Sequence, residues 1–270
     1  DGSGIWDTRN REEEGRGTMK LLGSMAIAFS MYSKIPVPQV EWTKERMKYA
    51  MCFFPLVGAA QGILLYAFAL LAWKWEFWVL YYVGGVALPI LVNGGIHMDG
   101  FLDVVDARAS FGDREKKLEI LKDPHVGSFA ILGAIVYVLL YLGIFVELPA
   151  AFLPAVGGIY VLTRAMSGLS VVWFPKAKNS GLAAAFSEDA QKKTVAVTMF
   201  LFMAASLCFI LWIAGTAAGI LCALAALAVY AYYYRMSIKE FGGITGDLAG
   251  YFLQICELVL IAALAVSLRI

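Results

Sequence analysis

This sequence has few charged residues and few cysteines for its length. Only 16% of its 270 residues are charged, whereas an average soluble protein has about 25%. The four cysteines fall in apolar runs without a CxxC spacing: Cys52, Cys208, Cys222 and Cys256. This arrangement excludes a disulfide framework and a zinc site built on cysteine pairs. The net charge is only +1 and no basic tail is present, so nothing in the sequence indicates a nucleic-acid partner.

Apolar residues, in contrast, make up 60% of the chain, more than a water-soluble fold of this size can bury. A helix needs about 17–25 apolar residues to cross the hydrocarbon core. The sequence therefore predicts an all-α, polytopic membrane bundle with about seven spans, at 51–73, 77–96, 129–146, 150–173, 195–214, 217–234 and 246–268. A shorter apolar run, 20–33, is expected to form an additional interfacial, re-entrant or tilted helix that ends before Pro36 and Pro38.

The connections between these spans alternate in length and charge. Long connections at 34–50, 97–128, 174–194 and 235–245 carry four, five, four and two Lys or Arg residues. Very short connections at 74–76, 147–149 and 215–216 contain only Lys74. Because basic loops stay on the cytoplasmic side, this pattern predicts a multi-pass protein of the cell (inner) membrane whose long loops, carrying the active site, face the cytoplasm.

The chain shows no internal repeat, so residues 19–270 are expected to form a single membrane-embedded catalytic domain. Residues 1–18 are polar, glycine-rich and charged, and lack the apolar core of a signal peptide. We expect them to be an unstructured leader or a remnant of upstream translation, with Met19 as the natural start. A homo-oligomer is compatible with the sequence, which does not define the oligomeric state.

Three aspartates stand out after the second predicted span. Asp99, Asp103 and Asp106 follow each other at i, i+4 and i+7, which places them on one face of a helix. A solvated helix face accounts well for the acids and bases of 115–122, but poorly for this stripe, which has no base at the partnering positions. Oxygen-rich groups of this kind suit Mg²⁺ shared with substrate phosphates. Gly100 would let a ligand or another backbone come close.

A second cluster, "FGGITGDLAG" at 241–250, leads into the last predicted span. Two interpretations are open. Either it is a flexible turn with Asp247 favoured at a helix N-terminus, or it is a loop whose amides, around Gly243, Thr245 and Gly246, bind a phosphate while Asp247 adds a metal ligand or base.

Arg164 and Glu257 lie well inside predicted spans. Ionisable groups there are costly and usually face an interior pathway or each other, which makes both functional candidates. The chain has two histidines, His97 and His125, which border the 97–128 loop; we interpret them as structural.

Several blocks of the sequence resemble one known family. "GGIHMDGFLDVVDA", followed by "REKKLEILKDPHVGSFAILG", is similar to the signature of cobalamin synthases (adenosylcobinamide-GDP ribazoletransferases). "FSMYSKIPVP", "FFPLVGAAQG" and "FGGITGDLAG" resemble three further blocks in the family's order. The resemblance implies a Mg²⁺-dependent membrane enzyme that joins adenosylcobinamide-GDP to α-ribazole, or to its 5′-phosphate. It releases GMP and forms adenosylcobalamin, or the corresponding 5′-phosphate.

Such a phosphoryl transfer needs mainly positioning and charge neutralisation from the protein. We expect the metal to be held by Asp99, Asp103 and Asp106, with Asp103, Asp106 and Asp247 as the catalytic carboxylates. Asp106 or Asp247 would accept the hydroxyl proton.

The residues expected to bind substrate are bases and glycines of the two clusters, one acid and the intramembrane arginine. They are Arg108, Lys122, Asp123, Arg164, Gly243, Thr245 and Gly246.

Two other functions remain to be weighed. A CDP-alcohol phosphotransferase also uses aspartates at a membrane face, but its later G-x-x-x-D-x-x-x-D element is missing here. A proton- or metal-coupled transporter would use Arg164 and Glu257 along a translocation path. Against a transporter, the acid cluster lies in a long loop and the two halves show no repeat.

Overall fold

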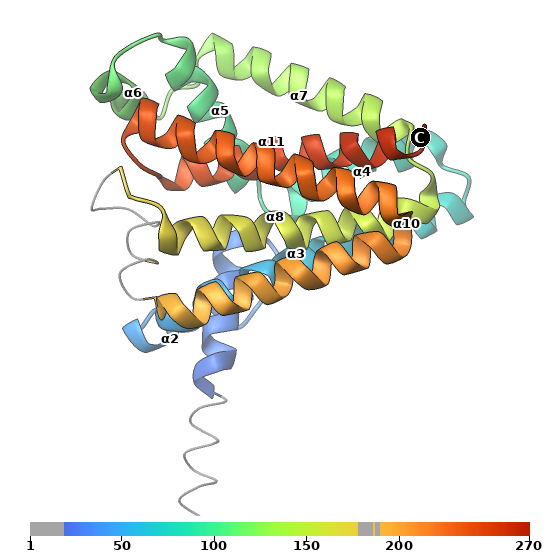
Figure 1. The fold of residues 1–270 in the computed structure, drawn as a ribbon, viewed down its shortest axis with the longest axis horizontal. Helices are drawn as coiled ribbons and strands as arrows, with labels where there is room; N and C mark the ends of the chain where they lie inside the picture. Colours follow the sequence, from blue (N-terminus) through green and yellow to red (C-terminus); the bar gives the residue numbers. More distant parts are fainter. Residues whose placement is uncertain (1–18, 178–185, 187–189) are drawn as a thin grey trace, which may run out of the picture.

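The protein is described by a computed structural model that covers residues 19–177, 186 and 190–270. These residues form helices and no strand, apart from a β-bridge between Lys176 and Ile244 (Figure 1). After the N-terminal helix Met19–Tyr32, the α-helices are α2 (Lys44–Ala50), α3 (Phe54–Lys74), α4 (Trp78–Val92), α5 (Ile96–Ala109), α6 (Arg114–Ile120), α7 (Ser128–Val146), α8 (Leu153–Trp173), α10 (Lys192–Met236) and α11 (Gly246–Ser267). The predicted leader, residues 1–18, lies outside the described residues.

Among the described residues, five helical segments are long and apolar enough to cross a membrane, or six if a bent pair is counted as one span. The five segments are Lys44–Lys74, Ser128–Val146, Ala150–Trp173, Lys192–Phe241 and Gly246–Ser267. The predicted all-α, multi-pass architecture is therefore confirmed, whereas the count of seven spans is not.

The segment Lys192–Phe241 contains two of the predicted spans, 195–214 and 217–234. Gly215 interrupts it with φ 87° and ψ 173°, which no helical residue adopts. Figure 1 shows the two halves of α10 folding back on each other at this point. Glycine is suited to this break because it lacks the Cβ that disfavours a positive φ.

The predicted span 77–96 is wrong at its C-terminal end. Helix α4 stops at Val92, and α5 begins at Ile96 at 91° to it. Gly94 and Gly95 make the turn with φ values of 66° and 78°. The Gly95 amide donates to Asn93 Oδ1 over 2.9 Å, which fixes the turn. Hydrophobicity alone did not reveal this corner, because the residues on both sides of it are apolar.

The connections gather at two opposite ends of the bundle. Figure 1 shows α6 and the π-helical turn Ser237–Phe241 at the left-hand end. The α3–α4 and α7–α8 turns and the fold-back within α10 lie at the right-hand end. The alternation of long basic and short connections in the sequence thus corresponds to two separate ends.

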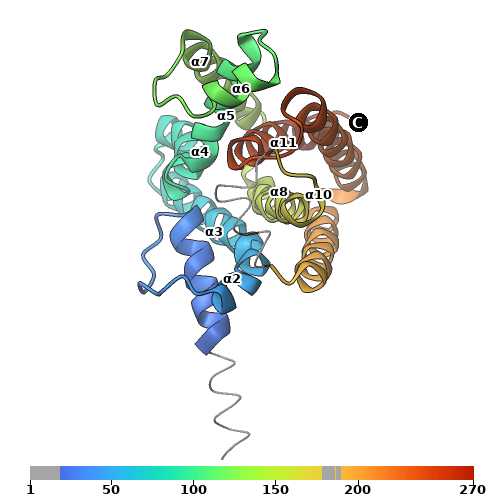
Figure 2. The ribbon, with the colours of Figure 1, turned by 90° about the vertical axis from the view of Figure 1, so that its left-hand side faces the viewer.

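Helix α8 is the centre of the bundle. Viewed along the helices, it lies between α3, α10 and α11 (Figure 2), and 89% of the apolar stretch within Ala150–Trp173 is buried. Glycines let α3 approach it closely: a Cβ on Gly62 would lie 2.5 Å from the Gly157 Cα, and one on Gly58 would lie 2.5 Å from the Tyr160 carbonyl oxygen. Small residues at such crossings are typical of membrane helices, which associate through close packing.

A buried ion pair ties α8 to α11. Arg164 Nη1 donates to Glu257 Oε1 over 2.8 Å, and the two side chains are 0% and 3% exposed. Arg164 Nη2 also donates to Gln61 Oε1 of α3 over 2.8 Å. The sequence had left this pairing open. Because either charge alone would be very costly here, the pair fixes the relative register of three helices.

We predict opposite effects of the same substitution at two helical glycines. Gly58→Ala should lower the stability by about 1–3 kcal/mol, because the new methyl group overpacks the α3–α8 crossing. Gly143→Ala in α7, where a Cβ meets no atom within 4 Å, should leave stability unchanged or raise it through helix propensity. Thermal unfolding in detergent measures both, and equal behaviour of the two variants would contradict the packing argument.

Candidate active site

The predicted aspartate stripe lies on one helix, α5. Asp99 is exposed, whereas Asp103 and Asp106 are partly buried. In the part of the chain that the structure describes, no basic side chain forms an ion pair with Asp99 or Asp103. Helix α5 is not one of the five apolar segments; it is the second half of the bent pair that begins with α4.

Helix α11 crosses α5 at two glycines and brings a fourth acid to the stripe. A Cβ on Gly100 would lie 2.7 Å from the carbonyl oxygen and 2.8 Å from the Cα of Asp247. A Cβ on Gly250 would lie 3.0 Å from the His97 carbonyl oxygen. The expectation that Gly100 permits a close backbone approach is thus confirmed, and the approaching backbone is that of Asp247.

The four acids act on each other electrostatically. Partial burial, together with the nearby charges of Asp99, Asp247 and Asp106, raises the pKa of Asp103 from 3.8 to about 7. A raised carboxylate pKa means that its surroundings disfavour the ionised form. The cluster is therefore suited to receive a cation or a proton.

Asp106, predicted as a metal ligand and proton acceptor, also makes contacts that join two helices. Its Oδ2 accepts the Gly127 amide over 2.6 Å and its Oδ1 accepts the Ala130 amide over 2.9 Å. These amides belong to the first turn of α7, whose donors have no partner within the helix. Asp106 thus anchors α7 to α5, and both of its oxygens are already engaged.

A complete metal cage is not present. Within residues 19–177 and 190–270 and Phe186, no group of three or more His, Cys, Asp or Glu side chains is arranged to hold a metal ion. Magnesium, however, is usually bound through one or two carboxylates together with substrate phosphates and water. The chemistry of Asp99 and Asp103, with Asp247 nearby, fits such a shared site. The predicted ligand set of Asp99, Asp103 and Asp106 stays a prediction.

The glycine-rich cluster is a structured helix start. Thr245 caps α11 by accepting the Leu248 amide over 3.2 Å, and it also donates to Asp247 Oδ2 over 3.3 Å. The Gly243 amide donates to Ser237 O over 3.0 Å and is therefore committed to the backbone. Gly246, in contrast, is exposed and has open space beside it. Of the predicted phosphate-binding glycines, only Gly246 remains accessible to a ligand.

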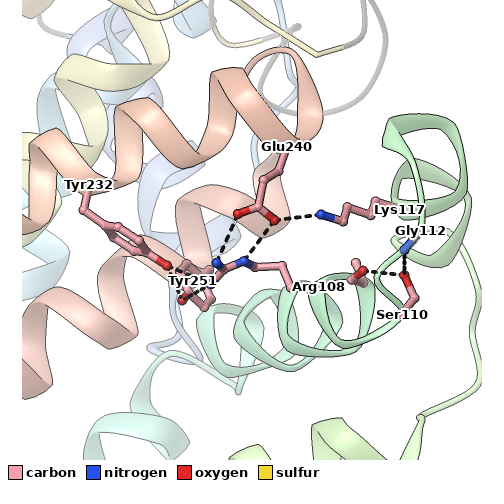
Figure 3. A network of polar contacts seen from close by, with 8 residues as sticks. Arg108, Ser110, Gly112, Lys117, Tyr232, Glu240 and Tyr251 are labelled. Atoms are coloured by element: carbon pink, nitrogen blue, oxygen red, sulfur yellow. Dashed lines mark hydrogen bonds and ion pairs between the residues drawn. The ribbon is translucent and has the colours of Figure 1, made fainter.

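Arg108 belongs to a network that joins α5 to α10 and the π-helical turn (Figure 3). Its Nε and Nη2 donate to the two carboxylate oxygens of Glu240 over 3.2 and 3.0 Å. Lys117 of α6 donates to the same carboxylate over 2.8 Å, and Arg108 Nη1 reaches the Tyr232 hydroxyl over 2.7 Å. Arg108 thus links α5 to the π-helical turn, and a phosphate would compete with the Glu240 carboxylate for its guanidinium group.

Two further predicted contacts lie on the exposed turn after α6. Lys122 and Asp123 are both exposed. Asp123 Oδ1 accepts the His125 amide over 3.0 Å and contacts His125 Nδ1 over 2.7 Å. These hydrogen bonds from His125 lower the pKa of Asp123. Contact of this turn with substrate stays a prediction.

The predicted substrate-binding role of Arg164 is not supported by its position. Its side chain is completely buried and its charge is neutralised by Glu257. Substrate would have to open the core of the bundle to reach it.

A cavity of about 300 Å³ adjoins the acid cluster. Its walls come from the N-terminal helix, α3, α5, α8 and α11, together with Phe186. The lining residues are Tyr32, Met51, Phe54, Ile96, His97, Asp99, Ser167, Val171, Phe186, Gly246, Asp247, Ala249, Gly250 and Leu253. His97, interpreted from the sequence as structural, is thus a cavity residue; its position two residues before Asp99 was the available signal.

The comparisons with known proteins show which family the chain belongs to. A family model described as cobalamin-5-phosphate synthase matches residues 24–265. The chain belongs to this family. A relative from Lachnoclostridium phytofermentans is 43% identical over 92% of this chain and 94% of its own. It is named adenosylcobinamide-GDP ribazoletransferase.

Further relatives carry the same name. The one from Desulfitobacterium hafniense is 32% identical over 89% of this chain and 96% of its own. That from Clostridium perfringens is 30% identical over 86% of this chain and 92% of its own. No solved structure matches the chain. The resemblance found in the sequence blocks is therefore confirmed across nearly the whole protein.

We predict that two aspartates of this cobalamin-5-phosphate synthase homologue contribute to stability in opposite ways. Asp106→Asn leaves an α7 amide without an acceptor and should cost about 1–3 kcal/mol. Asp99→Asn removes one of the charges that repel Asp103 and should leave the melting temperature unchanged or raise it. Thermal unfolding of both variants in chelator provides the measurement. Destabilisation by Asp99→Asn would argue against electrostatic repulsion between Asp99 and Asp103.

The raised pKa of Asp103 also predicts a pH dependence. The folded-state pKa lies above the ordinary value of 3.8, so its stabilising contribution is complete at low pH and is lost as pH rises through about 7. In chelator, the melting temperature should fall between about pH 4 and about pH 7. The fall should be smaller in Asp103→Asn. Parallel profiles of the two proteins would rule out this titration as the cause.

Proposed function

We propose that this protein transfers the adenosylcobinamide-phosphate group of adenosylcobinamide-GDP to a free ribose hydroxyl of α-ribazole, or of its 5′-phosphate. The oxygen of that hydroxyl forms a bond to the phosphorus next to cobinamide, the bond from this phosphorus to GMP breaks, and GMP leaves. The proposal rests on the family match over residues 24–265 and on two acids, Asp99 and Asp247, that line the cavity. This reaction completes the nucleotide loop of cobalamin.

The acid cluster supplies the charges that such a transfer needs. Asp99 and Asp103 are the residues that would hold Mg²⁺, and Asp99 lines the cavity together with Asp247. Magnesium bound there would neutralise the pyrophosphate and the charge that builds up on the leaving GMP. Burial and the neighbouring carboxylates raise the pKa of Asp103 to about 7, so a cation beside it would favour its ionised form.

Proton transfer is assigned to Asp247. Asp247 lines the cavity, whereas both Asp106 oxygens accept amides of α7. We therefore propose Asp247 as acceptor of the hydroxyl proton and Asp106 as a positioning residue that holds α7 against α5. Gly246, exposed at the start of α11, offers its backbone to a phosphate at the positive end of the helix dipole.

Membrane placement follows from the loop charges. The long connections carry nearly all of the Lys and Arg residues near the helix ends, and the acid cluster lies at the same end as α6. By the positive-inside rule, we propose that the protein lies in the inner membrane and that this end of the bundle faces the cytoplasm.

Asp103→Asn should reduce Mg²⁺-dependent GMP release by at least about 100-fold, because it removes a carboxylate that would hold Mg²⁺ at the reacting pyrophosphate. Glu115→Gln, on the exposed face of α6, is the matched control and should keep wild-type activity. Purified protein in nanodiscs is supplied with adenosylcobinamide-GDP and α-ribazole, with Mg²⁺ or with chelator, and GMP is quantified.

Wild-type protein without GMP release would contradict the proposed reaction. Full activity of Asp103→Asn, with normal membrane insertion, would contradict the role of the acid cluster.

A further inference from the structure

The cavity next to the acid cluster is lined by two chemically different groups of residues. One group is the carboxylates of Asp99 and Asp247 with the start of α11. The other is aromatic: the Tyr32 ring lies with its centroid 4.3 Å from that of Phe54 and 5.9 Å from that of Phe186. His97 lies against the same rings, with its centroid 6.2 Å from that of Tyr32.

His97 carries an unused donor. Its side chain is buried at 3% exposure, and Nε2 has no hydrogen-bond partner among the described residues. A buried N–H without an acceptor costs free energy. This N–H is therefore incomplete until something supplies an acceptor.

The surrounding contacts define which nitrogen holds the proton. The Gly95 amide donates to Asn93 Oδ1, so the Asn93 amide nitrogen is directed toward His97. That nitrogen lies 3.4 Å from His97 Nδ1, which must then accept. In the neutral ring the proton is consequently on Nε2, the atom without a partner.

The size and the lining of the cavity limit its ligand. Its 300 Å³ lies at the lower end of small-molecule sites, which span about 300–1,000 Å³, and a corrin ring is too large for it. A nucleoside fits this scale. Guanine would need acceptors for its N1–H and amino group, but the cavity's carboxylates are those of Asp99 and Asp247, which the proposed reaction uses at the phosphates.

A benzimidazole base matches better. Its fused ring is apolar and can pack among Tyr32, Phe54 and Phe186, and its one unsubstituted ring nitrogen is an acceptor without a hydrogen. We propose that this cavity is the α-ribazole subsite, in which His97 Nε2–H donates to that ring nitrogen and the reacting ribose hydroxyl lies toward Asp247. This assignment deepens the proposed function and rests on it for the identity of the nucleoside.

The test pairs a change in the protein with a change in the ligand. The probes are α-ribazole and its deaza analogue, in which C–H replaces the unsubstituted ring nitrogen. Thermal stabilisation of the protein by each compound reports binding without turnover. Wild-type protein should bind α-ribazole roughly ten-fold more tightly than the analogue, the effect of about one hydrogen bond.

His97→Leu should bind both compounds equally, and His97→Gln, whose amide nitrogen can take the place of Nε2, should restore part of the preference. His125→Leu removes the other histidine, on an exposed turn outside the cavity lining, and should keep the wild-type preference. In turnover, the KM for α-ribazole should rise in His97→Leu while that for adenosylcobinamide-GDP stays unchanged.

Equal binding of the two compounds by wild-type protein would overturn the proposal even if His97→Leu does not fold, because this measurement needs no variant. An unchanged preference in His97→Leu would overturn it as well. Loss of GMP release with the binding pattern intact would contradict the proposed reaction and leave the subsite standing.

Discussion

The candidate site depends on one steric constraint, the contact between the backbones of α5 and α11. Gly100 and Gly250 lie at this crossing, where a Cβ would meet the backbone of the other helix. The contact places Asp247 next to Asp99 and Asp103, although more than 140 positions separate them in the sequence. The electrostatic crowding at Asp103, the wall of the cavity and the position of His97 all follow from how closely these two helices approach.

Other contacts hold this arrangement in place from outside. Asp106 fixes the start of α7, and Glu240 binds Arg108 and Lys117, which links α5 and α6 to the turn before α11. In the interior, the Arg164–Glu257 pair sets α8 against α11. Four of these charged groups were functional candidates in the sequence, and each joins two elements of the bundle: Asp106, Arg108, Arg164 and Glu257.

The sequence predicted the helical membrane architecture, the single-helix aspartate stripe and the family, because apolar runs and residue spacing are local properties. It did not predict the corner at Gly94 and Gly95, where apolar residues continue on both sides of the turn. Spacing also could not distinguish Asp106, engaged by α7, from Asp99, which is exposed. Whether an acid serves as an anchor or faces a ligand depends on residues far away in the chain.

The glycine crossing also has a consequence for how the sequence can vary during evolution. Positions 100 and 250 share one volume, so a side chain gained at either one has to displace a backbone and not a flexible side chain. Drift at these two positions is therefore coupled, and compensation by a neighbouring residue is not available. Among homologues, both positions should stay small together, even where the surrounding apolar residues exchange freely.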